Sequence, residues 1–143
     1  MPTDENRRSI IVVDDEDALR KAVCATLRKA GYEVVGCARG SDALSKASQK
    51  KFDAAVLDLR MPGMSGLRLV HELHEVCPDT IVIILSAVPD LYGRLAEQFK
   101  TSGVYAFLHK PCTLQMLRDT IEQAFDEQER DLERVATLED VDP

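Results

Sequence analysis

Five short runs of aliphatic residues, separated by longer amphipathic segments, constrain the fold of this chain more than any other feature of its sequence. Each run has the length of a β-strand, and several are almost continuous in Val, Ile and Leu, as strands covered on both faces are. The runs are residues 10–13, 34–38, 54–57, 81–85 and 104–108. We therefore predict five parallel strands.

Between these runs, apolar residues recur at the three- and four-residue spacing of amphipathic helices. The stripes are Leu19, Val23 and Leu27; Leu44 and Ala47; Leu69, Val70, Leu73 and Val76; and Leu91, Leu95 and Phe99. Gly31 is predicted to end the first helix, Ser41 to cap the second, and Thr113 to begin the last. This alternation implies right-handed crossovers, and hence an α/β fold with an open parallel sheet and helices on both faces.

Acidic residues follow the first and third predicted strands. The stretch "IIVVDDED" at residues 10–17 ends a buried strand in four carboxylates, and "AAVLDLRMPG" places Asp58 at the end of the third strand. Because ligands of open parallel sheets bind beyond the carboxyl ends of the strands, we expect Asp14, Asp15 and Asp58 to converge there.

Such a carboxylate cluster needs a cation. Two unit charges some 4 to 5 Å apart repel by roughly 3 to 4 kcal/mol at an effective dielectric constant near 20. Oxygen-only ligation suits Mg²⁺, which completes its octahedron with waters and phosphate oxygens. The remaining strand ends supply a hydroxyl, Ser86, and an ammonium group, Lys110, so the sequence predicts a magnesium-dependent phosphate site.

Composition excludes several other classes of protein. A chain of 143 residues has the size of one domain with its own core. Its net charge of -7 argues against nucleic acid as a direct ligand. The four cysteines form no C-x-x-C pair, which favours inert thiols over a zinc or redox site; they are Cys24, Cys37, Cys77 and Cys112.

The sequence also lacks the features of a targeting or membrane-spanning segment. Its first residues, "MPTDENRRS", carry charge where a signal peptide has an apolar core. The longest apolar run, 81–85, is too short to cross a bilayer. We expect a cytoplasmic location without contact to the membrane.

Four motifs, each at the end of a predicted strand and in a fixed order, resemble those of the receiver domain of two-component response regulators. They are the acidic pair Asp14 and Asp15, the run "DLRMPGMSG" at 58–66, the pair "SA" at 86–87 and the pair "KP" at 110–111. The resemblance covers residues 10–125. It implies a flavodoxin-like sheet with the strand order 2-1-3-4-5.

The resemblance also implies a role for each site residue. Asp58 corresponds to the aspartate that accepts a phosphoryl group from a histidine kinase or a histidine phosphotransfer protein. Asp15, Asp58 and the backbone carbonyl of Arg60 correspond to direct Mg²⁺ ligands, and Asp14 to a ligand acting mainly through water. Ser86 and Lys110 correspond to the pair that binds the phosphoryl group. The protein is then a signalling phosphoacceptor rather than an enzyme.

Further residues are assigned through the same resemblance. Phe107, three residues before Lys110, occupies the position of the switch residue that responds to Ser86 and alters the surface of the fourth helix, fifth strand and fifth helix. Arg60 and Val88 border the path of the water that hydrolyses the acyl phosphate. The peptide bond before Pro111 is expected to be cis.

Simpler interpretations and two other protein classes compete with this one. Taken singly, the acidic pair could be a helix cap, Asp58 and Ser86 turn residues, and Lys110 a surface charge. A haloacid-dehalogenase-like phosphatase also uses a nucleophilic aspartate with Mg²⁺, but it needs a second aspartate two residues on, where this chain has Arg60. A flavodoxin-like cofactor binder needs a phosphate-binding loop where this chain has "DDED".

The predicted organisation is a flexible segment at 1–8, a receiver domain at 9–127 and a helical extension or linker at 128–143. In the last segment Leu132 and Val135 continue the apolar stripe of the final helix at near-heptad spacing. The extension leads to an output domain or is the tail of a stand-alone domain that acts on a partner protein. Formation of a homodimer remains open.

Overall fold

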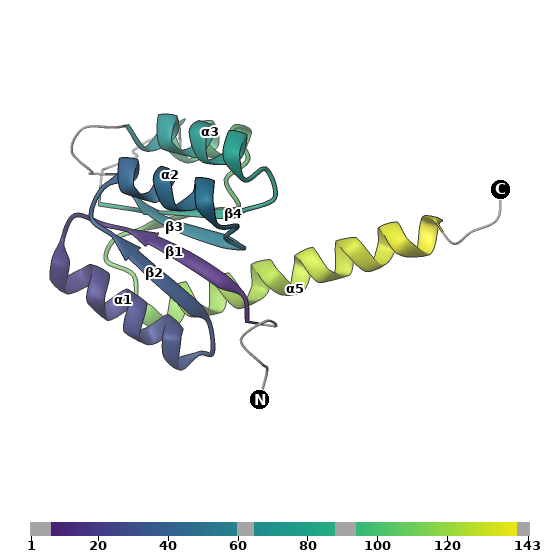
Figure 1. The fold of residues 1–143 in the computed structure, drawn as a ribbon, viewed down its shortest axis with the longest axis horizontal. Helices are drawn as coiled ribbons and strands as arrows, with labels where there is room; N and C mark the ends of the chain where they lie inside the picture. Colours follow the sequence, from purple (N-terminus) through teal and green to yellow (C-terminus); the bar gives the residue numbers. More distant parts are fainter. Residues whose placement is uncertain (1–6, 60–64, 88–93, 140–143) are drawn as a thin grey trace.

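A parallel five-stranded sheet forms the centre of the computed structural model (Figure 1). The structure describes residues 7–59, 65–87 and 94–139, and the side chains of all of these except residues 138 and 139. The strands are β1 (Ser9–Val13), β2 (Glu33–Cys37), β3 (Ala54–Asp58), β4 (Ile81–Ser86) and β5 (Ala106–His109). The helices are α1 (Asp17–Lys29), α2 (Gly40–Gln49), α3 (Gly66–Val76), α4 (Arg94–Thr101) and α5 (Leu114–Glu139). The sheet order β2-β1-β3-β4-β5 confirms the predicted fold class.

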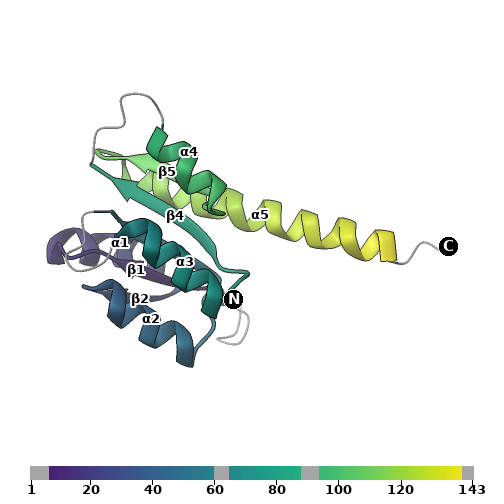
Figure 2. The same ribbon diagram turned by 90° about the horizontal axis from the view of Figure 1, so that it is seen from above.

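The helices cover both faces of the sheet. Helices α2, α3 and α4 lie on one face and α1 and α5 on the other, as Figures 1 and 2 show. The alternation of strand side chains follows this division, since Ile11 and Val13 of β1 pack with the first group and Ile10 and Val12 with the second. Burial on both faces explains why these strands read as continuous aliphatic runs.

Two of the three predicted helix ends are confirmed. Gly31 follows α1 with a φ of 100°, a left-handed conformation that glycine adopts without steric cost. Thr113 directly precedes α5, and its hydroxyl accepts a hydrogen bond of 3.0 Å from the backbone N–H of Met116.

The prediction that Ser41 caps the second helix is wrong. Helix α2 already begins at Gly40, with Arg39 in the extended conformation of an N-cap residue. The Arg39 carbonyl accepts the N–H of Ala43 at 3.2 Å, so Ser41 lies inside the first turn. The polar side chain alone suggested a cap, but the extended backbone of Arg39 and its bond from Ala43 place the N-cap two residues earlier.

The four cysteines are free thiols, as expected. Three of them are buried and Cys112 is half-buried. Burial raises the pKa of Cys24, Cys37 and Cys112 above the ordinary thiol value, which favours the protonated thiol over the reactive thiolate.

Helix α5 continues well beyond the sheet, and its second half projects away from the domain in Figures 1 and 2. The first half buries Leu117, Ile121 and Phe125 against the sheet. In the second half Leu132 is 64% exposed and Val135 is 51% exposed. Within the ranges that the structure describes, no helix combines the length and the apolar character needed to cross a membrane.

Contacts from the domain hold α5 where it leaves the sheet. The Arg8 guanidinium lies 4.3 Å from the centroid of the Phe125 ring and donates hydrogen bonds to Gln128 at 3.1 Å and to Glu129 at 2.7 Å. The Tyr105 hydroxyl also donates to a carboxylate oxygen of Glu127 in α5, at 2.8 Å. These contacts fix the direction of the projecting half of α5.

We expect Arg8→Ala to lower the free energy of unfolding by about 1 kcal/mol, because one cation–π contact and one partly exposed ion pair are lost. Amide hydrogen exchange should become faster over residues 126–139 of α5 and stay unchanged in the sheet. Arg134→Ala, at an exposed position of the same helix, is the control. Unchanged exchange in Arg8→Ala contradicts the assigned role.

Candidate functional site

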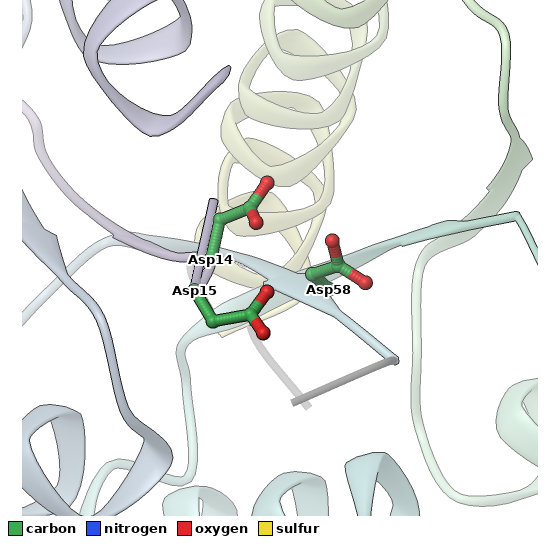
Figure 3. Close-up of side chains that lie close together, drawn as sticks. All are labelled: Asp14, Asp15 and Asp58. Carbon is green, nitrogen blue, oxygen red and sulfur yellow. The ribbon is translucent and has the colours of Figure 1, made fainter. Parts of the chain in front are cut away.

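Three carboxylates lie together at the carboxyl edge of the sheet (Figure 3). Asp14 and Asp15 follow β1, and Asp58 is the last residue of the adjacent strand β3. One oxygen from each carboxylate lies within 4.8 Å of the other two. The parallel pairing of β1 with β3 therefore brings together the acids that the sequence separates by more than forty positions, as predicted.

Two of these carboxylates are removed from solvent. Asp14 is 3% exposed and Asp58 is 5% exposed, whereas Asp15 is exposed. Burial raises the pKa of Asp14 above its ordinary value of 3.8, and repulsion by Asp58 adds to the rise, while the Glu16 backbone N–H and Lys110 oppose it. The folded state therefore binds the Asp14 proton more tightly than the unfolded state does. As a result, the free energy of unfolding falls as the pH rises from the unfolded pKa of Asp14 to its higher folded pKa, and it stays at the lower value above that.

In the described part of the chain, the ion pairs that involve Asp14 and Asp58 both have Lys110 as the cation. Its Nζ lies 2.5 Å from Asp58 Oδ2 and 3.9 Å from Asp14 Oδ2. Its backbone N–H donates to the Ser86 carbonyl at 2.6 Å, which ties the end of β5 to the end of β4. The Lys110–Pro111 peptide bond is cis, as the motif implies.

The donor set fits Mg²⁺. Three carboxylates and one ammonium group leave a formal charge of -2, and all potential ligand atoms are oxygens. Octahedral ligation at about 2.1 Å places neighbouring ligand atoms about 3 Å apart and opposite ones about 4 Å apart, which is compatible with the 4.8 Å grouping. Asp14, Asp15 and Asp58 are the side chains that would hold the ion. Arg60, predicted to add a backbone carbonyl, lies outside the described residues.

The predicted switch pair lies on neighbouring strands next to this cluster. Ser86, the last residue of β4, is 1% exposed and pairs in register with His109 of β5. Phe107 is half-buried, and its ring centroid lies 5.7 Å from that of Phe99 on α4. Phe107 thus connects β5 with α4. Val88, predicted to border the path of water, lies outside the described residues.

One residue near the site escaped the sequence analysis. Arg20, in α1, donates from Nη1 to the backbone carbonyl of Asp14 at 2.8 Å and from Nη2 to Asp17 Oδ1 at 2.6 Å. The three-residue spacing of Asp17 and Arg20 on a helix could have indicated the ion pair. The bond to the Asp14 carbonyl depends on how α1 packs against β1 and leaves no pattern in the sequence.

Residues 10–122 match the family model of the response regulator receiver domain. The chain belongs to this family. It is 33% identical over 121 residues to the transcriptional regulatory protein GlrR of Escherichia coli, and this alignment covers 82% of this chain and 26% of GlrR. It is 36% identical over 120 residues to the C4-dicarboxylate transport transcriptional regulatory protein DctD of Pseudomonas aeruginosa, with 82% and 25% covered. The chain thus spans about a quarter of the length of these two relatives.

Solved receiver structures support the same conclusion for the fold. A CheY-like response regulator receiver domain protein from Methanospirillum hungatei superposes with a TM-score of 0.82 at 27% identity, covering 88% of this chain and 99% of that one. Membership of the receiver family also decides against the dehalogenase-like and flavin-binding alternatives, since the match includes the strand ends that carry Asp14, Asp15, Asp58 and Lys110.

We expect Mg²⁺ to raise the free energy of unfolding by about 1 to 2 kcal/mol at roughly tenfold to thirtyfold excess over its Kd, because the ion binds the folded carboxylate cluster. Asp15→Ala should lose this gain at little other cost, since Asp15 is exposed. The exposed neighbour Glu16→Gln is the control and should keep the gain. Thermal melts that are insensitive to Mg²⁺ up to tens of millimolar would argue against a metal site.

Proposed function

We propose that this receiver domain accepts a phosphoryl group on Asp58 from a phosphohistidine of a histidine kinase or a histidine phosphotransfer protein, in a reaction that depends on Mg²⁺. The observation that carries the proposal is the environment of Asp58, which ends β3 beside the Lys110 ammonium at 2.5 Å and two further carboxylates within 4.8 Å. A nucleophilic carboxylate, a fixed ammonium group and an oxygen-rich cation site are the groups that phosphoryl transfer to aspartate requires.

In the proposed reaction an Asp58 oxygen attacks phosphorus as the P–N bond of phosphohistidine breaks. The electron pair of that bond returns to the imidazole, and the product is an acyl phosphate on Asp58. Asp58 needs no general base because a carboxylate oxygen, unlike a hydroxyl group, attacks phosphorus without giving up a proton. Asp14, Asp15 and Asp58 would hold a Mg²⁺ ion whose positive charge would stabilise the negative charge of the phosphoryl oxygens.

Lys110 and Ser86 complete the proposed site from the neighbouring strands. Formation of the acyl phosphate removes the charge from the Asp58 carboxylate, so the Lys110 ammonium turns from that carboxylate to a phosphoryl oxygen. The Ser86 hydroxyl donates a neutral hydrogen bond to another oxygen. The burial of Ser86 and Asp58 keeps competing water away from these contacts and strengthens them.

We propose that Ser86 and Phe107 transmit phosphorylation to the surface formed by α4, β5 and α5. Movement of Ser86 toward a phosphoryl oxygen opens space beside β5, and the Phe107 ring shifts into it. The contact between Phe107 and Phe99 supports this route, because a shift of one ring displaces the other and with it α4. Phe107 has no hydroxyl, so the output depends on packing rather than on an exposed phenol.

The proposal also covers the segments around the receiver domain and the output that it controls. The receiver domain spans 9–127 with Arg8 packed against α5, and the part of α5 from 128 to 139 is a helical extension that leads to an output domain or a partner protein in the cytoplasm. GlrR and DctD are named transcriptional regulatory proteins, which supports an output in gene regulation. The domain itself binds neither nucleic acid nor membrane in this proposal, consistent with its net charge of -7.

Asp58→Asn tests the phosphoacceptor. Incubation of the wild type with acetyl phosphate and Mg²⁺ should raise its intact mass by one phosphoryl group, and removal of Mg²⁺ by a chelator or the substitution Asp58→Asn should abolish the increase. Asp42→Asn, at an exposed position of α2, is the matched control and should label normally. Labelling of Asp58→Asn to the wild-type extent would falsify the assignment.

We expect a long-lived acyl phosphate because of the two residues proposed to border the path of the hydrolysing water. Arg60 is long enough to cover the phosphoryl group and pair with it, and Val88 offers an incoming water no hydrogen bond. After removal of the donor, the double variant Arg60→Asn, Val88→Glu should therefore lose its phosphoryl group faster than the wild type. Decay at the same or a slower rate would show that these residues do not control hydrolysis.

A further inference from the structure

We infer that Arg20 is a positioning residue for the metal site, which holds the acidic loop after β1 in the conformation that presents Asp15 to the ion. The inference rests on the proposed function, because it concerns the same cation. It assigns to Arg20 two tasks, the orientation of the Asp14–Asp15 peptide and the retention of Asp17 outside the ligand set.

The first task follows from the hydrogen bonds of the loop. The Asp14 backbone N–H donates to the Cys37 carbonyl of β2 at 3.1 Å, and the Asp14 carbonyl accepts from Arg20 Nη1 at 2.8 Å. The Asp14 side chain in turn accepts the Glu16 N–H at 2.9 Å. Arg20 therefore fixes the plane of the peptide from which Asp15 projects. Asp15 is exposed, and this backbone contact compensates for the packing that its side chain lacks.

The second task follows from the distribution of charge in "DDED". Four consecutive acidic side chains could all approach a divalent cation, yet among the described residues the group with mutually close ligand atoms comprises Asp14, Asp15 and Asp58. The Asp17 carboxylate instead pairs with Arg20 Nη2 at 2.6 Å. Arg20 thereby limits the site to three carboxylates, a small donor set that leaves positions for water and phosphoryl oxygens and so suits Mg²⁺ better than Ca²⁺.

The packing of the Arg20 stem makes these contacts rigid. Its side chain is 17% exposed. It lies over Gly36 of β2, where a Cβ atom would come within 3.4 Å of Arg20 Cγ and Cδ and within 3.1 Å of Cys24 Sγ. The guanidinium group is therefore held by a packed stem and by two hydrogen-bonded partners, unlike a surface arginine that pairs transiently.

The sign of the effect on metal affinity separates positioning from simple electrostatics. Removal of the Arg20 charge, together with release of the Asp17 carboxylate that it pairs with, should strengthen cation binding if charge alone matters. Loss of a positioning contact should weaken it, by about tenfold for groups of this kind. Arg20→Met is thus expected to weaken binding of Mn²⁺, used as a paramagnetic probe for the Mg²⁺ site, by about tenfold.

The experiment measures free Mn²⁺ by electron paramagnetic resonance in titrations of the wild type, Arg20→Met and Lys21→Met. Lys21 is exposed on the same turn of α1, so its variant removes the same charge without touching the loop and should bind Mn²⁺ as tightly as the wild type or slightly more tightly. Arg20→Lys keeps the charge with a single nitrogen and should show an intermediate affinity. At saturating metal, the phosphorylation rate of Arg20→Met should approach that of the wild type.

Equal or tighter binding of Mn²⁺ by Arg20→Met overturns the inference. If that variant fails to fold in a circular dichroism melt, Arg20→Lys decides instead, and wild-type affinity in Arg20→Lys counts equally against a positioning role. Absence of Mn²⁺ binding in the wild type itself would reject the proposed metal site, so the two failures are distinguishable.

Discussion

The repulsion among Asp14, Asp15 and Asp58 is the constraint on which the rest of this structure depends. Two of these carboxylates are almost fully buried, and the raised pKa of Asp14 shows that the fold holds charge there at a cost. Lys110, 2.5 Å from Asp58, offsets part of it. A cation or a phosphoryl group that binds at this edge changes the repulsion among the carboxylates and therefore the stability of the domain. A phosphorylation switch needs this coupling between binding at one site and the stability of the fold.

The parallel sheet makes this arrangement available. All five strands end at the same edge, so residues placed directly after separate strands become neighbours: the acids after β1 and β3, Ser86 at the end of β4 and Lys110 after β5. The opposite edge has a different task. There Arg8 and Tyr105 contact α5 where it leaves the domain, so the projecting half of this helix has a defined direction.

Most of the fold and the core of the site were predictable, and the errors have local causes. The central strands β1, β3 and β4 were found because burial on both faces produces aliphatic runs, and Asp14, Asp58 and Ser86 because each directly follows such a run. The fifth strand begins at Ala106 rather than at residue 104, since Val104 is buried without joining the ladder, which starts with the pairing of Ile83 and Ala106. The prediction of a cap at Ser41 fails because it rests on side-chain type alone, whereas the backbone of Arg39 adopts the N-cap conformation and accepts the N–H of Ala43.

The sequence by itself determined the elements, their order and the chemical types at the strand ends, because periodicity and residue type are local properties of the chain. Only the tertiary structure decided which distant groups touch. The contact of Arg8 with Gln128 joins residues 120 positions apart. The contact of Arg20 with the Asp14 carbonyl involves a backbone atom that every residue type shares. Such contacts depend on the angle at which each helix packs on the sheet, which arises from the whole core and is written in no single segment.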